Sequence, residues 1–185
     1  MIQMNLPKAQ ERIIFDVMTM CVQKMNPYVS YYTNMAKYLC QSNGKYRIML
    51  TRRIWDRLSE FSLLRDGEVG NLANFIVEIV DAKCVNIAVL KTLPFTEGSP
   101  KLRTFLEKIF LKIFDDDRRS LCEGVFQNLP TSDSLVGFKQ ILKSYIERCI
   151  LGKFKKGSLK VKSKDFENRI SFALDLLSSQ YVAKL

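Results

Sequence analysis

Apolar positions recur at spacings of three and four along most of the chain, which is the period of one face of an α-helix. The clearest example follows Ser99-Pro100, an N-cap residue and a proline suited to the first helical position. Its apolar positions are Leu102, Phe105, Leu106, Ile109, Phe110 and Ile113. No segment shows sustained alternation with a period of two between hairpin turns. The sequence therefore predicts an all-α protein.

The same spacing predicts further helices, separated by short segments containing Gly, Pro or Asn. Asn26 is expected to cap a helix that has Pro27 at its first position, and Asn43-Gly44 to end it. The expected helices cover about 8–24, 27–42, 45–63, 68–81, 86–93, 100–114, 118–127, 133–150 and 165–184. Short connections of this kind favour antiparallel helix pairs stacked in a HEAT-like layer.

Two of the apolar stripes predict which side chains are buried. On the first helix they are Ile13, Ile14, Val17, Met18, Cys21 and Val22, and on the third they are Ile48, Trp55, Leu58 and Phe61. Because Trp55 lies within its stripe, we interpret it as a packing residue rather than a platform for a nucleic-acid base.

Length and composition indicate a globular chain with a real core. The chain has 185 residues, of which 47% are hydrophobic, and a chain of this length buries roughly 70% of its unfolded surface. The longest apolar runs are far shorter than the ~20 residues of a membrane span. The N-terminus shows no basic region followed by a long apolar stretch, so no secretory signal is expected. These patterns predict no membrane segment.

The chain offers few groups for catalysis or metal binding. It has no histidine, which removes the commonest general base and metal ligand. Its five cysteines, Cys21, Cys40, Cys84, Cys122 and Cys149, are scattered and odd in number. This favours reduced thiols in the cytosol or nucleus over a disulfide framework or a zinc site. We therefore predict no enzyme activity, cofactor, metal or small-molecule substrate.

Positive charge is concentrated near the C-terminus. The formal net charge is +10, and residues 151–185 carry eight Lys or Arg against three acidic residues. Within them, the basic segment 152–164 contains Lys153, Lys155, Lys156, Lys160, Lys162 and Lys164. Lysines on a loop suit phosphate oxygens better than base edges, so one interpretation is contact with an RNA backbone and a salt-dependence slope of roughly −3 to −5. The alternative is a solvated linker, and a third hypothesis is a membrane surface with anionic lipids.

Two other charged clusters allow more than one interpretation. Arg47, Arg52, Arg53 and Arg57 could form a second basic surface, but Arg53 with Asp56 and Arg57 with Glu60 have the spacing of intrahelical ion pairs. Residues 115–117 are three consecutive aspartates. Adjacent side chains on a helix diverge, so we favour interaction with the positive end of the following helix over a partner's salt bridge or a metal.

Several short sequence motifs occur in the order typical of one family. They are Asn26-Pro27-Tyr28 with Tyr31-Tyr32, Ile54-Trp55-Asp56-Arg57, Asn71-Leu72-Ala73, and Val89-Leu90-Lys91 with Phe95. Over about residues 12–149 the chain resembles an MA-three domain, the all-helical module with which translation factors and nuclear relatives engage DEAD-box RNA helicases. It is most similar to nucleolar proteins that carry an MIF-four-G domain before the MA-three domain and serve small ribosomal subunit assembly.

The resemblance implies an adaptor in the nucleolus or nucleus. Its expected role is scaffolding in small-subunit assembly and pre-18S rRNA processing, with rRNA, ribosome-assembly proteins and a DEAD-box helicase as partners. The alternative is an adaptor in pre-mRNA splicing or translation initiation. A different class of hypothesis is an enzyme that uses lysine or carboxylate groups.

The resemblance also sets the expected domain boundaries. We expect an MA-three-like domain at 1–151, the basic segment as a loop at 152–164 and a C-terminal helix at 165–185. The family's first helix and its MIF-four-G domain have no counterpart in this sequence. The expectation is therefore a reduced member or a separately encoded half.

Overall fold

The computed structural model describes residues 8–95, 99–115, 119–161 and 164–182, and these form α-helices, short 3-10 segments and connecting turns without a strand. The predicted all-α fold is confirmed. The chain divides into two compact units, residues 1–85 and residues 86–185, and each is described separately. The expected boundaries at 151 and 164 stay a prediction.

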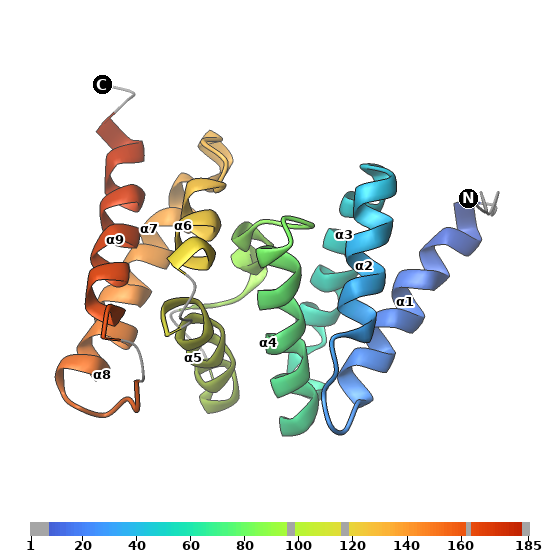
Figure 1. The fold of residues 1–185 in the computed structure, drawn as a ribbon, viewed down its shortest axis with the longest axis horizontal. Helices are drawn as coiled ribbons and strands as arrows, with labels where there is room; N and C mark the ends of the chain where they lie inside the picture. Colours follow the sequence, from blue (N-terminus) through green and yellow to red (C-terminus); the bar gives the residue numbers. More distant parts are fainter. Residues whose placement is uncertain (1–7, 96–98, 116–118, 162–163, 183–185) are drawn as a thin grey trace. The chain divides into compact units, whose positions relative to one another are not determined.

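The first unit contains four helices. They are α1 (Lys8–Lys24), α2 (Tyr31–Ser42), α3 (Lys45–Ser59) and α4 (Asp66–Asp81). A 3-10 turn at Phe61–Leu63 lies between α3 and α4. Figure 1 shows that α1 runs antiparallel to α4 and that α2 runs antiparallel to α3. α1 and α2 each contact the other three helices of this unit. The core includes Phe15, Met18, Leu50, Ile54 and Leu72.

The prediction for the start of α2 is wrong. The helix begins at Tyr31 rather than Pro27, after a cis Asn26–Pro27 peptide bond. Tertiary hydrogen bonds explain the difference, because the hydroxyls of Tyr28 and Ser30 each donate to the Glu78 carboxylate on α4, at 3.0 Å. These bonds hold residues 27–30 against α4 as a loop.

The predicted buried face of α1 is wrong in part. Ile13 and Val17 are 54% and 52% exposed, whereas the buried face contains Phe15, Met18 and Val22. This face also carries the polar side chains Glu11, Thr19 and Gln23. Glu11 accepts hydrogen bonds from Lys45 Nζ at 2.6 Å and Tyr46 Oη at 3.1 Å, and the Thr19 hydroxyl donates to the Phe15 carbonyl at 2.9 Å. Glu11 and Thr19 can therefore turn inward because hydrogen-bond partners are supplied.

The predicted face of α3 needs a similar correction. Ile48 is 57% exposed and Trp55 is half-buried, while Leu50, Ile54 and Leu58 form the buried stripe and Phe61 is buried as expected. The predicted and the observed stripes both have helical spacing, so spacing alone could not choose between them. Lys45 and Arg53 pair with Glu11 and Asp16 of α1, and this contact between helices selects the face that is buried.

The second unit is built around aromatic rings. It contains a 3-10 segment (Ile87–Thr92), α5 (Pro100–Phe114), α6 (Arg119–Gln127), a 3-10 turn (Asp133–Leu135), α7 (Val136–Tyr145), α8 (Gly152–Lys155) and α9 (Phe166–Val182). All six predicted core positions of α5 are buried. At its end the fully buried Phe114 lies 5.7 to 6.2 Å, between ring centroids, from Phe110, Phe126 and Phe166.

The predicted helix at 133–150 continues further than expected. α7 passes through a π-helical segment, Ile146–Leu151, directly into α8. Gly152 has α-helical backbone angles, with φ −61° and ψ −40°, and Phe154 packs its ring 4.9 Å from that of the buried Phe166. The first four residues of the basic segment are therefore helical, which corrects the prediction of a loop from residue 152.

Candidate nucleic-acid interface

The basic segment 152–164 begins as the end of a helix with fixed geometry. Gly157 has φ 67°, a conformation that glycine adopts without a steric penalty. Its N–H donates to the Phe154 carbonyl at 2.9 Å, and the N–H of Ser158 donates to the Lys153 carbonyl at 3.0 Å. This pair of bonds is a Schellman motif, and it turns the chain sharply away from α8.

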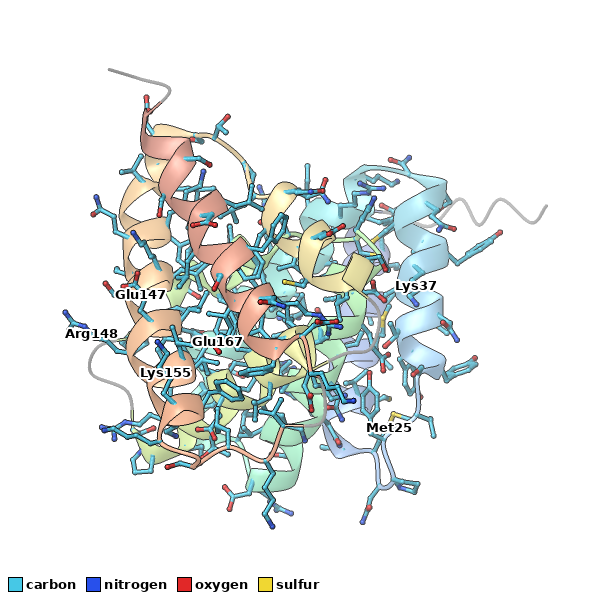
Figure 2. All side chains as sticks on the ribbon, turned by 60° about the vertical axis from the view of Figure 1, so that its left-hand side comes forward. Met25, Lys37, Glu147, Arg148, Lys155 and Glu167 are labelled. Atoms are coloured by element: carbon cyan, nitrogen blue, oxygen red, sulfur yellow. The ribbon has the colours of Figure 1, made fainter. Side chains whose placement is uncertain are left out.

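The lysines of this segment fall into two groups. Lys153 pairs with Glu107 of α5, and Lys155 Nζ lies 3.9 Å from Glu167 Oε1 of α9, as Figure 2 shows for the second pair. All members of these pairs except the half-buried Glu107 are exposed, so each pair contributes little to stability. They do hold the two amines against the protein.

The second group consists of Lys156, Lys160 and Lys164. All three are exposed, and none makes an ion pair with a described residue. Lys162 lies outside the described residues. Between these lysines, Leu159 and Val161 are half-buried, so the apolar residues face the protein while the described lysines face solvent. Exposed amines in a row can contact successive phosphates without reading bases. A role for these residues in RNA binding stays a prediction.

The four arginines of α3 are arranged differently. The predicted intrahelical pairs are confirmed, at 3.1 Å between Arg53 and Asp56 and at 3.0 Å between Arg57 and Glu60. Arg53 also pairs with Asp16 of α1. Arg47 and Arg52 are exposed, and Arg47 Nε donates to the Cys40 carbonyl at 3.4 Å. α3 therefore presents fewer unpaired cations than its sequence suggests, and its use as a second RNA surface stays a prediction.

The aspartate cluster lies mostly outside the described residues. Asp115 follows α5, and its N–H donates to the Leu111 carbonyl at 2.8 Å, whereas Asp116 and Asp117 are not described. The expected interaction with a helix N-terminus stays a prediction. Within the described ranges, no three Cys, Asp or Glu side chains are grouped so that they could hold a metal ion.

Residues from two of the short sequence motifs that carry the family resemblance form polar links within the first unit. The amide of Asn71, on α4, donates to the carbonyls of Gln23 at 2.9 Å and Met25 at 2.7 Å. Tyr28 bonds to Thr33 at 3.0 Å and to Glu78, and burial raises its pKa, which the nearby Glu78 carboxylate reinforces. These links fasten the α1–α2 loop to α4, so Asn71 and Tyr28 are structural residues.

Sequence reasoning missed an exposed apolar surface on α1. Its members are Ile13, Val17 and Met20, which are 54%, 52% and 41% exposed, and we call them the α1 apolar surface. They follow each other at spacings of four and three. An open groove beside them is lined by Val17, Met20, Cys21, Lys24, Met25 and Tyr32. Helical spacing alone could not identify this surface, because it resembles a core stripe.

Comparison with known proteins agrees with the resemblance described above. Residues 2–86 match the MA3 domain, a span that ends at the boundary between the two units. The chain is 24% identical over 166 residues to "Nucleolar MIF4G domain-containing protein 1 homolog" of Drosophila melanogaster, an alignment covering 88% of this chain and 19% of that protein. It is 22% identical over 152 residues to "Nucleolar MIF4G domain-containing protein 1" of Homo sapiens, covering 82% and 18%.

These matches confirm the resemblance to an MA-three domain of nucleolar MIF-four-G proteins, and with it the HEAT-like all-α class. The chain spans about a fifth of the length of these relatives. Their names indicate a nucleolar location and an MIF4G domain. Among the helices that the structure describes, none is both long and apolar enough to cross a membrane.

Proposed function

We propose that this chain, which matches the MA3 domain over residues 2–86, is a non-catalytic adaptor in small ribosomal subunit biogenesis. It contacts rRNA backbone in a preribosomal particle together with ribosome-assembly proteins, among them a DEAD-box helicase. The nucleolar relatives support the compartment. The single observation that carries the RNA contact is the row of exposed lysines on the basic segment.

The physical basis of the RNA contact is release of counterions. Lys156, Lys160 and Lys164 are exposed and make no ion pair with the described residues, so they can neutralise phosphates without first losing a carboxylate partner. Lys153 and Lys155 would have to leave Glu107 and Glu167. Three or four phosphate contacts give a slope of log affinity against log salt of roughly −2 to −4. This is somewhat shallower than the sequence alone suggested.

The direct test compares two sets of substitutions that each remove positive charge. Lys156→Gln, Lys160→Gln and Lys164→Gln together should reduce the magnitude of the salt slope by roughly 2 to 3, measured by fluorescence anisotropy with a single-stranded RNA. The matched control, Arg47→Gln with Arg52→Gln on α3, should change it much less. An unchanged salt slope in the lysine variant would refute the assignment of the RNA contact to the basic segment. A reduced slope in the arginine variant alone would assign the contact to α3 instead.

A cellular experiment distinguishes the proposed pathway from its alternatives. The tagged chain is purified from its own cells, and the co-purifying RNA and proteins are identified. Recovery of small-subunit precursor rRNA with assembly factors supports the proposal. Recovery of spliceosomal RNAs, or of translation factors without precursor rRNA, would instead support an adaptor in splicing or translation initiation.

The absence of catalysis has its own test. The purified chain alone should show no ATP turnover above that of buffer. Turnover that follows the chain through purification would contradict an adaptor role. Flotation with liposomes of anionic lipid, compared with neutral lipid, tests whether the basic segment binds membranes instead.

A further inference from the structure

The α1 apolar surface continues into the groove between α1 and the start of α2. This groove is lined by Val17 and Met20 of α1, by Met25 of the α1–α2 loop (Figure 2) and by Tyr32 of α2. The exposed ring of Tyr31 lies 5.1 Å, between centroids, from that of Tyr32. The apolar area therefore extends from α1 across the groove, which holds about 440 Å³, to α2.

α1 carries two apolar faces, whereas a surface helix of a globular protein needs only one. The core of the first unit buries one of them, with Phe15, Met18 and Val22 each 1% exposed. At about 100° per residue, these residues and the α1 apolar surface point to nearly opposite sides of the helix. Packing within the first unit therefore does not account for the exposed set.

The spacing of the exposed set fits a helix as the occupant of the groove. Ile13, Val17 and Met20 are separated by four and three residues and form one ridge along α1. Such a ridge packs against a second helix whose apolar residues have the same spacing. The described residues contain no strand, so an extended peptide would find no sheet edge to join there.

Charge indicates which kind of helix fits. The acidic residues of α1, Glu11 and Asp16, are both paired with cations of α3, and α2 has no acidic residue. Arg12 and Lys24 are exposed beside the α1 apolar surface, and neither makes an ion pair with a described residue. Lys24 also lines the groove. The rim of the groove on α1 is therefore positively charged and complementary to acidic side chains.

We propose that this groove binds one amphipathic helix of a partner protein that carries acidic residues beside its apolar stripe. The apolar side chains of that helix enter the groove against Val17 and Met20, while its carboxylates lie near Arg12 and Lys24. Burial of apolar atoms drives the association, and the charges favour an acidic helix over a basic one. The site adds a protein contact to the proposed function and does not depend on the RNA contact of the basic segment.

Two other occupants fit the charge and the apolar area less well. In a second copy of this chain paired along α1, Lys24 would lie near Lys24 if the helices were parallel and near Arg12 if they were antiparallel. Both arrangements bring like charges together, which is unfavourable. A nucleic acid would be attracted by the cations alone and would not use the exposed apolar side chains.

Photo-cross-linking identifies the occupant. In the full chain, p-benzoylphenylalanine takes the place of Ile13, and irradiation in the chain's own cells is followed by mass spectrometry of the cross-linked peptides. The expected peptide belongs to another protein and has apolar residues at spacings of three and four with acidic residues beside them. The control places the same group at Ile141, which is 43% exposed on α7, and should not capture that peptide. A peptide without this pattern, RNA, this chain itself, or no cross-link above the control would each overturn the proposal.

The captured peptide is then synthesised, and its affinity for the purified full chain is measured by fluorescence anisotropy. Met20→Glu should weaken binding roughly tenfold or more, because it places a carboxylate in the groove opposite an acidic helix. Ile141→Glu is the matched control and should leave the Kd unchanged. Both positions are exposed, and circular dichroism checks that both variants keep their helices. Equal affinities in the two variants would contradict the site.

Two charge variants separate this site from the RNA contact. Arg12→Gln with Lys24→Gln should weaken peptide binding by roughly threefold to tenfold at low salt, and much less at about 0.5 M salt, because salt screens exposed charges. An affinity that this variant leaves unchanged at low salt would overturn the choice of an acidic helix. Lys156→Gln, Lys160→Gln and Lys164→Gln together should leave the peptide's affinity unchanged, whatever they do to RNA binding. A loss of peptide binding in that variant would place the peptide on the basic segment instead.

Discussion

The two units of this chain have similar helical content but are held together in different ways. Residues 86–185 pack aromatic rings around Phe114, and they carry eighteen Lys or Arg against eleven Asp or Glu. Residues 1–85 combine an apolar core with polar links such as those of Asn71 and Glu78, and they carry eleven Lys or Arg against eight Asp or Glu. The second unit therefore holds most of the excess positive charge.

The exposed surfaces differ as well. Ten large apolar side chains are exposed among the described residues, and eight of them belong to the first unit. A gathered apolar surface is typical of contact with another protein, whereas exposed lysines suit a polyanion. The difference indicates that one type of helical scaffold presents two kinds of surface, each made by residues that packing leaves free. The following predictions test whether the two units differ as described.

The largest expected effect concerns two neighbouring residues of α1. Met18 is 1% exposed and Val17 is 52% exposed. Met18→Ala should lower the free energy of unfolding by about 2–5 kcal/mol, because it leaves a cavity in the core. Val17→Ala should change it by less than about 0.5 kcal/mol. Urea denaturation followed by circular dichroism measures both, and similar losses in the two variants would mean that the α1 apolar surface is not exposed in solution.

A smaller effect is expected at the polar links of the first unit. Asn71→Asp removes the amide that donates to the carbonyls of Gln23 and Met25 and puts a carboxylate beside them. We expect a loss of about 1–3 kcal/mol in the free energy of unfolding. Asn34→Asp, on the exposed side of α2, is the control and should cost less than about 0.5 kcal/mol. Equal losses would show that the links to the α1–α2 loop do not stabilise the first unit.

The smallest effect compares the same helix ending in the two units. Lys83 and Gly157 both occupy the left-handed position of a Schellman motif, with φ 57° and 67°. Lys83→Gly should raise the free energy of unfolding by about 0.5–1 kcal/mol, because a side chain is strained there. Gly157→Ala should lower it by about 1 kcal/mol. A Cβ at Gly157 would meet nothing within 4 Å, so any loss comes from the backbone, and opposite signs in thermal melts are the decisive result.

Much of the fold could be predicted from local patterns. Ser99-Pro100 marks the start of α5, where the Ser99 hydroxyl accepts the N–H of Leu102 at 3.3 Å, and the apolar spacing of α5 gives its buried face correctly. The ion pairs of Arg53 and Arg57 with Asp56 and Glu60 also follow from spacing. In each case the interacting groups are within four residues of each other, so the helix itself brings them together.

At the candidate site, local patterns could not predict contacts between residues on different helices. The sequence identified the basic segment, but it could not show that Lys153 and Lys155 would be paired with Glu107 and Glu167, which lie on other helices. Nor could it show that Phe154 would extend the helix by packing on Phe166.

The sequence by itself determined that this protein is all-α, where most of its helices lie, and that its excess positive charge is near the C-terminus. Only the tertiary structure decided which face of α1 and α3 is buried and where α2 begins. The physical reason is that apolar positions with helical spacing occur on more than one face of these helices, so the helix could rotate about its own axis and bury either face. Contacts from distant residues, such as Lys45 with Glu11 and Tyr28 with Glu78, stabilise one of them.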